Sequence, residues 1–326
     1  MLCILSPNTN PYFNLASEEY LLKHFQEDLF FLYRNTPSIV VGKHQNTLAE
    51  INLPFVQEHE ILVARRISGG GTVFHDLGNL NFAFFTSGKE GELVDYKRAT
   101  LPILEALKEM GLEARLGKRN ELLLKGLKIS GTASHVFKQR VLHHGTLLFS
   151  SEMGKLSAAL KSDQQNFTDR AVKSHRSRVT NISDHLAEAM DVEMFQERIL
   201  DHMLRTFKDA SPYLLSQSDI FEIKTLRDSK FSTWEWNFGY SPKYHFFRSI
   251  SFPAGLLELH MNVEKGVIKE LKILGDFTSL NDITLLENML VGTIHDPETI
   301  RIKLSETTVS EYISGLENEK LLSGMF

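Results

Sequence analysis

Three consecutive glycines, Gly69 to Gly71, lie inside the sequence RRISGGGTVFH, between the apolar segments ILVARRIS and NLNFAFFT. Glycine has no Cβ atom, so it adopts positive φ angles readily and lets backbone N–H groups approach a ligand closely. Both flanking segments have the composition of β-strands. The sequence therefore predicts a strand, a bare turn and a strand. The turn is either a hairpin or bulge with unusual torsion angles, or a backbone cradle for an anion.

Two familiar phosphate-binding patterns do not fit this turn. The P-loop pattern is absent, and the dinucleotide-binding GxGxxG pattern needs a following helix, whereas TVFH leads into another strand. On a strand, Arg66 and Ser68 share one face, while Arg65 and Ile67 share the other. One arginine can therefore point into a site and clamp a carboxylate or phosphate, while its neighbour lies in solvent or in a surface ion pair.

A second polar stretch, KISGTASH, occupies residues 128–135. Alternation along a strand places Lys128 on the same face as three hydroxyl side chains, those of Ser130, Thr132 and Ser134. This face is either the ordinary wet side of a half-buried strand or a surface that meets an anionic ligand.

Histidine and cysteine patterns favour structural roles over metal binding. His143 and His144 are adjacent on a predicted strand, so they face opposite ways and do not easily ligate one ion. The zinc-type spacings and HExxH are missing, as is the GxSxG elbow of serine hydrolases. We therefore expect no structural metal site, and we interpret His75 and the only cysteine, Cys3, as structural residues as well.

The composition is that of an ordinary globular protein. The 326 residues are 42% hydrophobic and 24% charged, which is enough for about two domains. A net charge of −5 argues against a dedicated nucleic-acid-binding protein. The N-terminus lacks a basic segment and no apolar run is long enough to cross a membrane, so we predict no membrane association. A single cysteine fits a reducing compartment, and we predict a cytoplasmic location.

The periodicity of the chain predicts a sheet-rich first part with a few helices. We expect a helix capped by Asn14, and a pair of strands formed by residues 28–35 and 37–46. A long helix over 95–110 and a strand–turn–strand unit around Lys125 and Gly126 follow. Helices begin again near 193, and a boundary is predicted at 240–245. The remaining part reads as a small α+β unit.

Six segments taken together resemble the lipoate–protein ligase family, which also holds lipoyl and octanoyl transferases and, more distantly, biotin ligases. They are YFNLASEEYLL, PSIVVGKHQNTLAEIN, ARRISGGGTVFHDLGNLNFAFF, KISGTASHVFKQRVLHHGTLLFS, KSHRSRVTNISDHL and WEWNFGYSPKY. The resemblance implies an α/β (α+β) fold: a biotin ligase-like catalytic core on a mixed sheet over residues 1–240, and a small C-terminal α+β domain over 245–326.

The resemblance also implies a two-step reaction. Lipoate and MgATP give lipoyl-adenylate and pyrophosphate, and the lipoyl group then passes to a lysine of a lipoyl domain. The acceptors implied are the 2-oxoacid dehydrogenase complexes and the glycine cleavage H protein. ATP and Mg²⁺ are thus the expected cofactors, with lipoate as substrate.

Matching positions imply individual roles. Lys128 resembles the lysine that contacts both the lipoyl carboxylate and the α-phosphate, and it is the expected catalytic residue. The expected ATP- and adenylate-binding residues are Arg66, Gly71, Thr72, Val73, Phe74, Lys128 and Asn120. The lipoate site is expected at Lys128, Tyr33, Ser68 and His144, and Glu121 is a possible magnesium ligand. Fixed cations suit this chemistry because a carboxylate that attacks a phosphate meets like-charge repulsion.

Two positions depart from the family pattern. Tyr33 stands where tryptophan is frequent, and His135 stands where an arginine can follow the SG motif. These departures concern the shape of the lipoyl pocket, not the chemistry. The basic segment from Lys173 to Asn181 resembles a mobile segment that closes over the adenylate; an ordinary solvated loop is the alternative.

Alternative functions stay open. A transferase that takes octanoyl or lipoyl from a carrier uses a cysteine nucleophile in related enzymes, but Cys3 lies outside every motif. A transferase that accepts preformed lipoyl-adenylate is a second alternative, and a non-enzymatic lipoyl-binding protein is a third.

Overall fold

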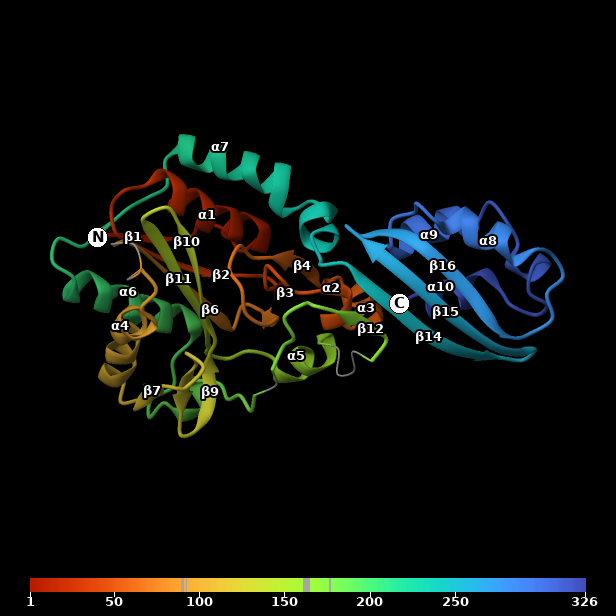
Figure 1. Ribbon diagram of the computed structural model, residues 1–326. Coiled ribbons are helices and arrows are strands. Elements are labelled where there is room, and N and C mark those ends of the chain that lie inside the picture. Colours follow the sequence, from red (N-terminus) through yellow and green to blue (C-terminus); the bar gives the residue numbers. More distant parts are fainter. Residues whose placement is uncertain (89–90, 92, 161–164, 176) are drawn as a thin grey trace. The chain divides into compact units, whose positions relative to one another are not determined.

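The structure is a computed structural model that describes residues 1–88, 91, 93–160, 165–175 and 177–326. The chain divides into two compact units, neither of which is one continuous stretch of sequence (Figure 1). Unit 1 comprises residues 1–43, 59–159 and 174–233, and unit 2 comprises 44–58, 160–173 and 234–326. The short segment 44–58 thus packs with the C-terminal residues, although it precedes the glycine turn in sequence. The predicted domain boundary at 240–245 stays a prediction.

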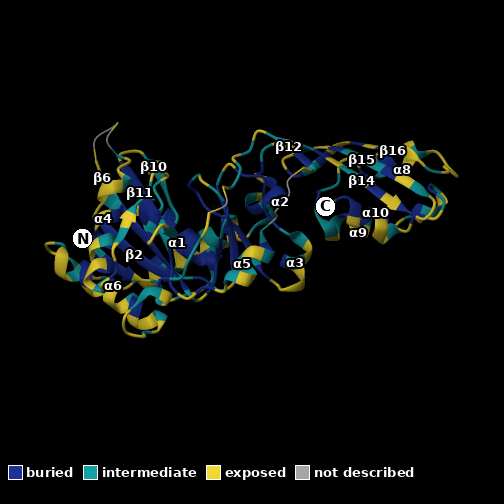
Figure 2. Cartoon of the chain, turned by 90° about the horizontal axis from the view of Figure 1, so that it is seen from below, coloured by how far each residue is buried: buried dark blue, intermediate teal, exposed yellow. Residues whose placement is uncertain are grey.

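A mixed six-stranded sheet forms the centre of unit 1, as predicted. Its strand order is β10 (Thr132–Phe137), β11 (Arg140–Leu148), β6 (Asn79–Ser87), β2 (Leu29–Arg34), β1 (Leu2–Leu5) and β13 (Ser211–Pro212). Strand β1 runs parallel to both of its neighbours, and the other pairs are antiparallel. Strands β2 and β6 are buried over most of their length (Figure 2), because helices cover both faces of the sheet.

Two smaller sheets complete the strands of unit 1. One has the order β4 (Leu62–Arg65), β3 (Ser38–Val41), β5 (Val73–His75), and the other is the antiparallel set β7 (Ala114–Leu116), β8 (Leu122–Leu124), β9 (Leu127–Ser130). The predicted pairing of residues 28–35 with 37–46 is wrong. Strand β2 is apolar on both faces and lies between β1 and β6, whereas β3 pairs with β4 and β5. Closeness in sequence did not decide the partner, because burial of both faces of β2 needs the centre of a sheet.

Helices lie on both faces of the central sheet (Figure 1). On one face are α1 (Pro11–His24) and α7 (Gln217–Leu226), and on the other are α4 (Tyr96–Glu109) and α6 (Val192–Thr206). The helix predicted over 95–110 is confirmed, and so is the helix after 193. The shorter helices of unit 1 are α5 (Met153–Ala159), η1 (Ser183–His185) and η2 (Arg227–Phe231).

The predicted cap of the first helix is wrong by one turn. Asn10 is the N-cap, and its side chain accepts from the backbone N–H groups of Tyr12 and Phe13. Pro11 begins the helix, where its missing N–H costs nothing. Asn14 is instead buried inside the helix and donates from Nδ2 to the Asn35 side chain at 2.8 Å. A tertiary partner for Asn14 therefore displaced the local capping role that its residue type favours.

Unit 2 is built on an antiparallel sheet with the order β12 (Phe167–Asp169), β14 (Tyr244–Phe252), β15 (Gly255–Glu264) and β16 (Val267–Asp276). The small α+β unit expected in the last part of the sequence is confirmed. Its helices are α2 (Thr47–Glu50), α3 (Leu53–Glu58), η3 (Glu235–Gly239), α8 (Ile283–Leu290), α9 (Pro297–Leu304), η4 (Val309–Glu311) and α10 (Asn318–Gly324). Within the described residues, no helix is both long and apolar enough to cross a membrane.

Candidate active site

The glycine turn connects β4 to β5 and is not a hairpin. Strand β3 lies between these two strands and pairs with both, so the chain from 66 to 72 passes over the end of β3. Gly70 has a φ of +91°, and a Cβ atom added there would lie 3.0 Å from Nη2 of Arg66. The turn therefore needs glycine both for its torsion angle and for the close approach of the arginine.

Arg66 holds the turn from inside. Its Nη2 donates to the carbonyl oxygens of Gly69 and Gly71, both at 2.7 Å, and its Nη1 donates to the carbonyl oxygen of Val40 at 3.1 Å. The Nε atom donates to the Ser68 hydroxyl at 3.1 Å, which confirms that these two side chains share a face. Burial lowers the pKa of the guanidinium to about 10. Most of the N–H donors of Arg66 therefore bond to the protein itself.

The neighbouring arginine corrects the prediction that one of the pair lies in solvent. Arg65 is fully buried, and its Nη1 donates to the carbonyl oxygens of Gly42 and Lys43 at 3.0 and 3.1 Å. Both arginines therefore brace backbone segments at the end of the small β4–β3–β5 sheet. The predicted separation of Arg65 and Arg66 onto two faces is correct, but both faces lie inside the protein.

A buried polar chain runs from the glycine turn to helix α1. The Ser68 hydroxyl lies 2.6 Å from Nε2 of His144, whose Nδ1 lies 2.8 Å from Oε2 of Glu18. Glu18 also accepts a hydrogen bond from the Tyr33 hydroxyl at 2.9 Å. All four side chains are buried, and burial together with Glu18 raises the pKa of Tyr33 well above its usual value. Three predicted lipoate-site residues thus meet in one network.

Lys128 differs from Arg66 in having no fixed partner. It lies on β9 after the confirmed turn at Lys125–Gly126, half-buried, and its Nζ makes no hydrogen bond or ion pair with any residue that the structure describes. Burial lowers the pKa of its ammonium, while Glu121 opposes that shift and Arg66 adds to it. Nearby on the strand, the buried Ser130 hydroxyl also lacks a partner among the described residues. These groups are free to meet a ligand.

His75 and His143 are buried, hydrogen-bonded histidines. His75 receives a hydrogen bond at Nδ1 from Asn35 at 2.9 Å, and burial lowers its pKa to about 3. Its buried Nε2 has no partner among the described residues. His143 accepts from the backbone N–H of Asp95, and burial lowers its pKa to about 4. No group of three or more metal-ligating side chains occurs in the described part of the chain.

The possible metal ligand and its neighbour lie on the loop before β8. Asn120 has a φ of +62°, and its carbonyl oxygen accepts from the Thr132 hydroxyl. Glu121 is partly exposed and accepts from the backbone N–H of Arg119 at 2.8 Å. One partly exposed carboxylate, electrostatically coupled to Lys128, is a donor set that suits Mg²⁺ only when nucleotide phosphates supply further oxygens.

The segment from Lys173 to Asn181 contacts both the end of the glycine turn and the strand that carries Lys128. Within unit 1, the Ser174 hydroxyl accepts from the backbone N–H of Thr72 at 2.9 Å, just after the glycine turn. Further on, Val179 pairs with Lys128 in a parallel bridge. Arg176 lies outside the described residues. The remaining predicted adenylate residues, Val73 and Phe74, follow on β5, where Phe74 is buried in the core.

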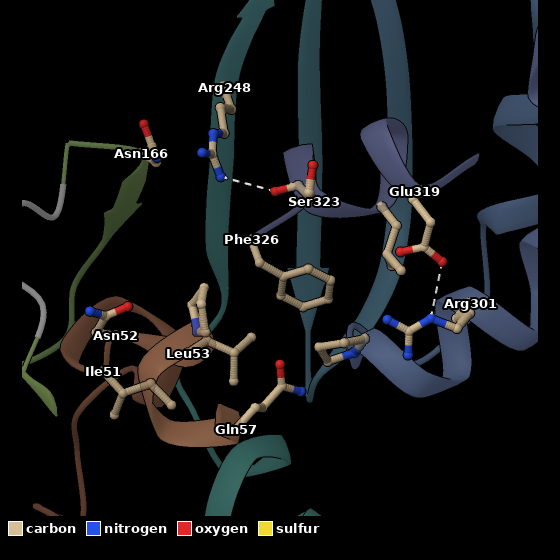
Figure 3. A pocket seen from close by; sticks show the side chains of 13 residues that line it. Ile51, Asn52, Leu53, Gln57, Asn166, Arg248, Arg301, Glu319, Ser323 and Phe326 are labelled. Atoms are coloured by element: carbon tan, nitrogen blue, oxygen red, sulfur yellow. Dashed lines mark hydrogen bonds and ion pairs between the residues drawn. The ribbon is translucent and has the colours of Figure 1, made fainter. Parts of the chain in front are cut away.

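A cavity of about 460 Å³ lies within unit 2 (Figure 3). Arg248 donates to the carbonyl oxygen of Ser323 at 3.1 Å, and Arg301 pairs with Glu319 at 3.2 Å at its rim. None of the predicted site residues lines this cavity. The candidate site is therefore the region of unit 1 around the glycine turn and Lys128.

Glu18 contacts predicted site residues and was missed from the sequence, as was Asn35, which contacts His75. Ser174, in contrast, lies in the predicted segment from Lys173 to Asn181. Glu18 reads as an ordinary acid in the first turn of a helix, and nothing in NLASEEYLL marks it as buried. It meets His144 across 126 positions of sequence, which only the fold brings together.

Comparison with known proteins decides the family. A profile described as "Lipoyl protein ligase A/B catalytic domain" matches residues 10–204, and one described as "Bacterial lipoate protein ligase C-terminus" matches 241–325. The chain belongs to the lipoate–protein ligase family. It is 39% identical to lipoate-protein ligase LplJ of Bacillus subtilis over 99% of each chain, and 40% identical to lipoate–protein ligase 1 of Staphylococcus aureus over 96% of each.

Solved structures of lipoate–protein ligases have the same fold. LipL1 of P. falciparum in complex with lipoate is 28% identical, with a TM-score of 0.63 over 99% of this chain and 97% of that one. Lipoate-protein ligase A bound with ATP is 25% identical, with a TM-score of 0.61 over 74% and 100%. A bi-partite ligase from Thermoplasma acidophilum, described with its E2 lipoyl domain, is 26% identical, with a TM-score of 0.63 over 73% and 96%.

Proposed function

We propose that this lipoate–protein ligase joins lipoate to ATP, giving lipoyl-adenylate and pyrophosphate, and then transfers the lipoyl group to a lysine of lipoyl domains. The acceptors proposed are the E2 subunits of 2-oxoacid dehydrogenase complexes and the glycine cleavage H protein. Relatives bound to lipoate and to ATP, and one studied with an E2 lipoyl domain, support this assignment. A reducing, cytoplasmic setting is proposed from the single, buried cysteine.

The observation that carries the proposal is the half-buried ammonium of Lys128, for which the described part of the chain supplies no hydrogen-bond or ion-pair partner. A lipoate carboxylate that attacks the α-phosphate brings two anions together. A cation about 4 Å from a phosphate oxygen contributes roughly 4 kcal/mol at an effective dielectric constant near 20. Lys128 is therefore the proposed catalytic residue, and it contacts both the carboxylate and the α-phosphate.

The glycine turn is proposed to receive the nucleotide along the backbone of Gly71, Thr72, Val73 and Phe74. Arg66 supports this site by holding the carbonyl groups of the turn inward, which leaves N–H groups to face the ligand. The Thr72 N–H is occupied by the Ser174 hydroxyl, so ligand binding along the turn displaces or rearranges that contact.

Lipoate is proposed to bind beside Tyr33, Ser68 and His144. Two buried groups have no hydrogen-bond partner among the described residues, Nε2 of His75 and the Ser130 hydroxyl. Both are suited to a bound polar ligand, because a buried polar group left unpaired is costly.

Magnesium is proposed to bind at Glu121, with Asn120 nearby and nucleotide phosphates as further ligands. A single carboxylate combined with substrate phosphates is the usual way in which proteins hold this ion. When bound, Mg²⁺ neutralises charge on the phosphates. Glu121 also interacts electrostatically with Lys128.

The cysteine-dependent transferase is disfavoured by the state of Cys3. Its thiol is buried, and burial raises its pKa to about 11, so it carries almost no reactive thiolate at neutral pH. The transferase that accepts preformed lipoyl-adenylate differs from the ligase only in the first half-reaction.

Lipoate-dependent exchange of labelled pyrophosphate into ATP tests the first half-reaction directly. We expect exchange that requires lipoate and Mg²⁺ together. Transfer from supplied lipoyl-adenylate to a lipoyl domain tests the second half-reaction. Transfer without exchange would assign the adenylate-dependent transferase, and loss of both would leave only a binding role.

A further inference from the structure

We propose that the cavity of unit 2 binds a small organic anion, a carboxylic acid with a short apolar chain. The cavity has a volume of about 460 Å³, which lies in the range of roughly 300–1,000 Å³ that small-molecule sites occupy. It is lined by residues of unit 2 and by none of the residues proposed to contact lipoate or the nucleotide. The inference therefore goes beyond the proposed function and does not depend on it.

The position of Arg248 on its strand is unusual. Alternate residues of β14 face the core of unit 2, and four of them are buried and belong to it, namely Tyr244, Phe246, Ile250 and Phe252. Arg248 occupies the middle position of this row, in register with the fully buried Leu259 of β15. A charged group at an inward position costs free energy unless its charge and its donors find partners. The structure thus places a cation where the pattern of the strand favours an apolar residue.

The guanidinium of Arg248 is only partly satisfied by the protein. Its Nη1 donates to the carbonyl oxygen of Ser323 at 3.1 Å. Among the residues that the structure describes, no other acceptor and no carboxylate pairs with it. A guanidinium has five N–H donors in a planar fork, and a pair of them matches the two oxygens of a carboxylate. Arg248 therefore retains the donors that such a bidentate pair needs.

The second arginine of the cavity is already paired with acids. Arg301 forms ion pairs with Glu298 at 2.8 Å and with Glu319 at 3.2 Å. Figure 3 shows Arg301 and Glu319 on the other side of the Phe326 ring from Arg248. Of the two lining arginines, Arg248 is thus the one whose charge no ion pair balances within the described ranges. One such cation suits a ligand with a single negative charge rather than a polyanion such as a nucleoside triphosphate.

A carboxamide lies at the Arg248 end of the cavity. The carbonyl oxygen of Asn166 accepts from the backbone N–H of Phe247 at 2.9 Å, which places Asn166 next to the strand position of Arg248 (Figure 3). Asn166 also lines the cavity. An amide N–H can donate to the same carboxylate that pairs with a guanidinium. Arg248 and Asn166 are therefore the groups that would hold the carboxylate.

The lining also includes apolar side chains that are held in place. Leu53 and Phe326 pack against the core of unit 2. The Phe326 ring stacks on the imidazole of His295, with the ring centroids 4.6 Å apart. His295 is itself held by hydrogen bonds of 2.6 Å with the Tyr244 hydroxyl and the Met325 carbonyl oxygen. This preformed wall suits an alkyl chain, so the cavity matches a carboxylic acid with an apolar tail.

The test is photo-labelling of the full chain with octanoic acid that carries a diazirine on its chain. Illumination followed by peptide mapping locates the probe, which separates this cavity from any other site on the protein. We expect saturable labelling within residues 51–57 and 319–326 that excess octanoate suppresses. Octylamine, a cation of the same chain length, is expected not to suppress it, because Arg248 recognises the negative charge.

Arg248→Gln removes the charge and keeps a polar side chain. Loss of a charge-assisted pair predicts that the Kd of the probe at this site rises by roughly tenfold to a hundredfold. Arg248→Lys, which keeps the charge but not the fork, is expected to give an intermediate Kd. Lys269→Gln is the matched control and should leave the Kd unchanged, because Lys269 is exposed on β16 and does not line the cavity. Urea unfolding checks that each variant is folded.

Several results would overturn the inference. They are the absence of labelling in the two segments, equal labelling of folded Arg248→Gln, and suppression by octylamine as strong as that by octanoate. Suppression by inorganic phosphate as strong as that by octanoate would also contradict it, because the site would then take an inorganic anion. The competition series and Arg248→Lys decide the matter even if Arg248→Gln does not fold. Pyrophosphate exchange tests the proposed function separately from all of these results.

Discussion

Arg66 and Lys128 are the two cations expected to meet the reacting anions, and their surroundings differ completely. The guanidinium of Arg66 donates to three backbone carbonyl groups and one hydroxyl. The ammonium of Lys128 has no hydrogen-bond or ion-pair partner within the described residues. Arginine has a planar fork of donors that can brace several acceptors at once, whereas lysine is a single mobile charge. One cation therefore shapes the site, and the other is left to act in it.

The comparison shows that positive charge alone does not identify a ligand contact. A buried cation is stable when its donors are satisfied, as for Arg66, and it then contributes through the backbone that it holds. Lys128 is half-buried and has no partner among the described residues, and burial lowers the pKa of its ammonium. An anionic ligand offsets the cost of removing this charge from water.

The largest effect is expected for Lys128→Ala. The substitution removes the ammonium and with it about 4 kcal/mol of electrostatic stabilisation of the reacting anions. This predicts a fall of roughly a thousandfold in the rate of pyrophosphate exchange. The free energy of unfolding should stay within about 1 kcal/mol, because the Lys128 side chain bonds to no side chain or backbone group in the described ranges. Exchange and urea unfolding measure the two quantities, and Lys108→Ala, an exposed position on α4, is the control. A fall in stability as large as the fall in activity would contradict the division of roles.

A smaller effect, on the free energy of unfolding, is expected for Arg66→Ala. Leaving the carbonyl groups of Val40, Gly69 and Gly71 without a donor predicts a loss of about 3 kcal/mol in the free energy of unfolding. Arg66→Lys should recover less than half of this, because lysine cannot reproduce the fork. Urea denaturation measures both variants. Loss of exchange at full stability would instead assign Arg66 to direct ligand contact.

The smallest effect concerns the neutral histidine beside the glycine turn. His75 has a folded pKa of about 3, below its unfolded value, so the unfolded chain takes up a proton first and stability falls as the pH drops below about 6.5. Between pH 6.5 and 5 this amounts to about 1.5 kcal/mol. His75→Gln should reduce the acid-dependent loss by that amount in urea unfolding at each pH. The control, His24→Gln on the exposed end of α1, should not reduce it.

Local patterns predicted much of the fold. The turn at Lys125–Gly126 and the helix predicted over 95–110 follow from turn chemistry and short-range periodicity, and both are observed, the helix as Tyr96–Glu109. Strand partners were predicted less well. Strand β2 pairs with β6, more than forty residues away, because a strand that is apolar on both faces is satisfied only inside a sheet.

The candidate site was also predicted only in part. The predicted shared face of Arg66 and Ser68 is confirmed, because Nε of Arg66 donates to the Ser68 hydroxyl. His143 and His144 have different partners, Asp95 and Glu18, as expected for adjacent residues on a strand. The expectation of one solvent-facing arginine is wrong, because Arg65 lies against the carbonyl groups of Gly42 and Lys43 inside the protein. Alternation assigns faces, but it does not say whether a face meets water.

The sequence by itself determined the bare turn, the lysine on its strand and membership of the lipoate–protein ligase family, since these depend on residue types in a fixed order. Only the tertiary structure decided that Arg66 turns inward, that Lys128 has no partner among the described residues, and that Glu18 reaches His144. Hydrogen-bond partners depend on distances of about 3 Å between atoms far apart in the chain, and packing of α1 against the sheet sets those distances.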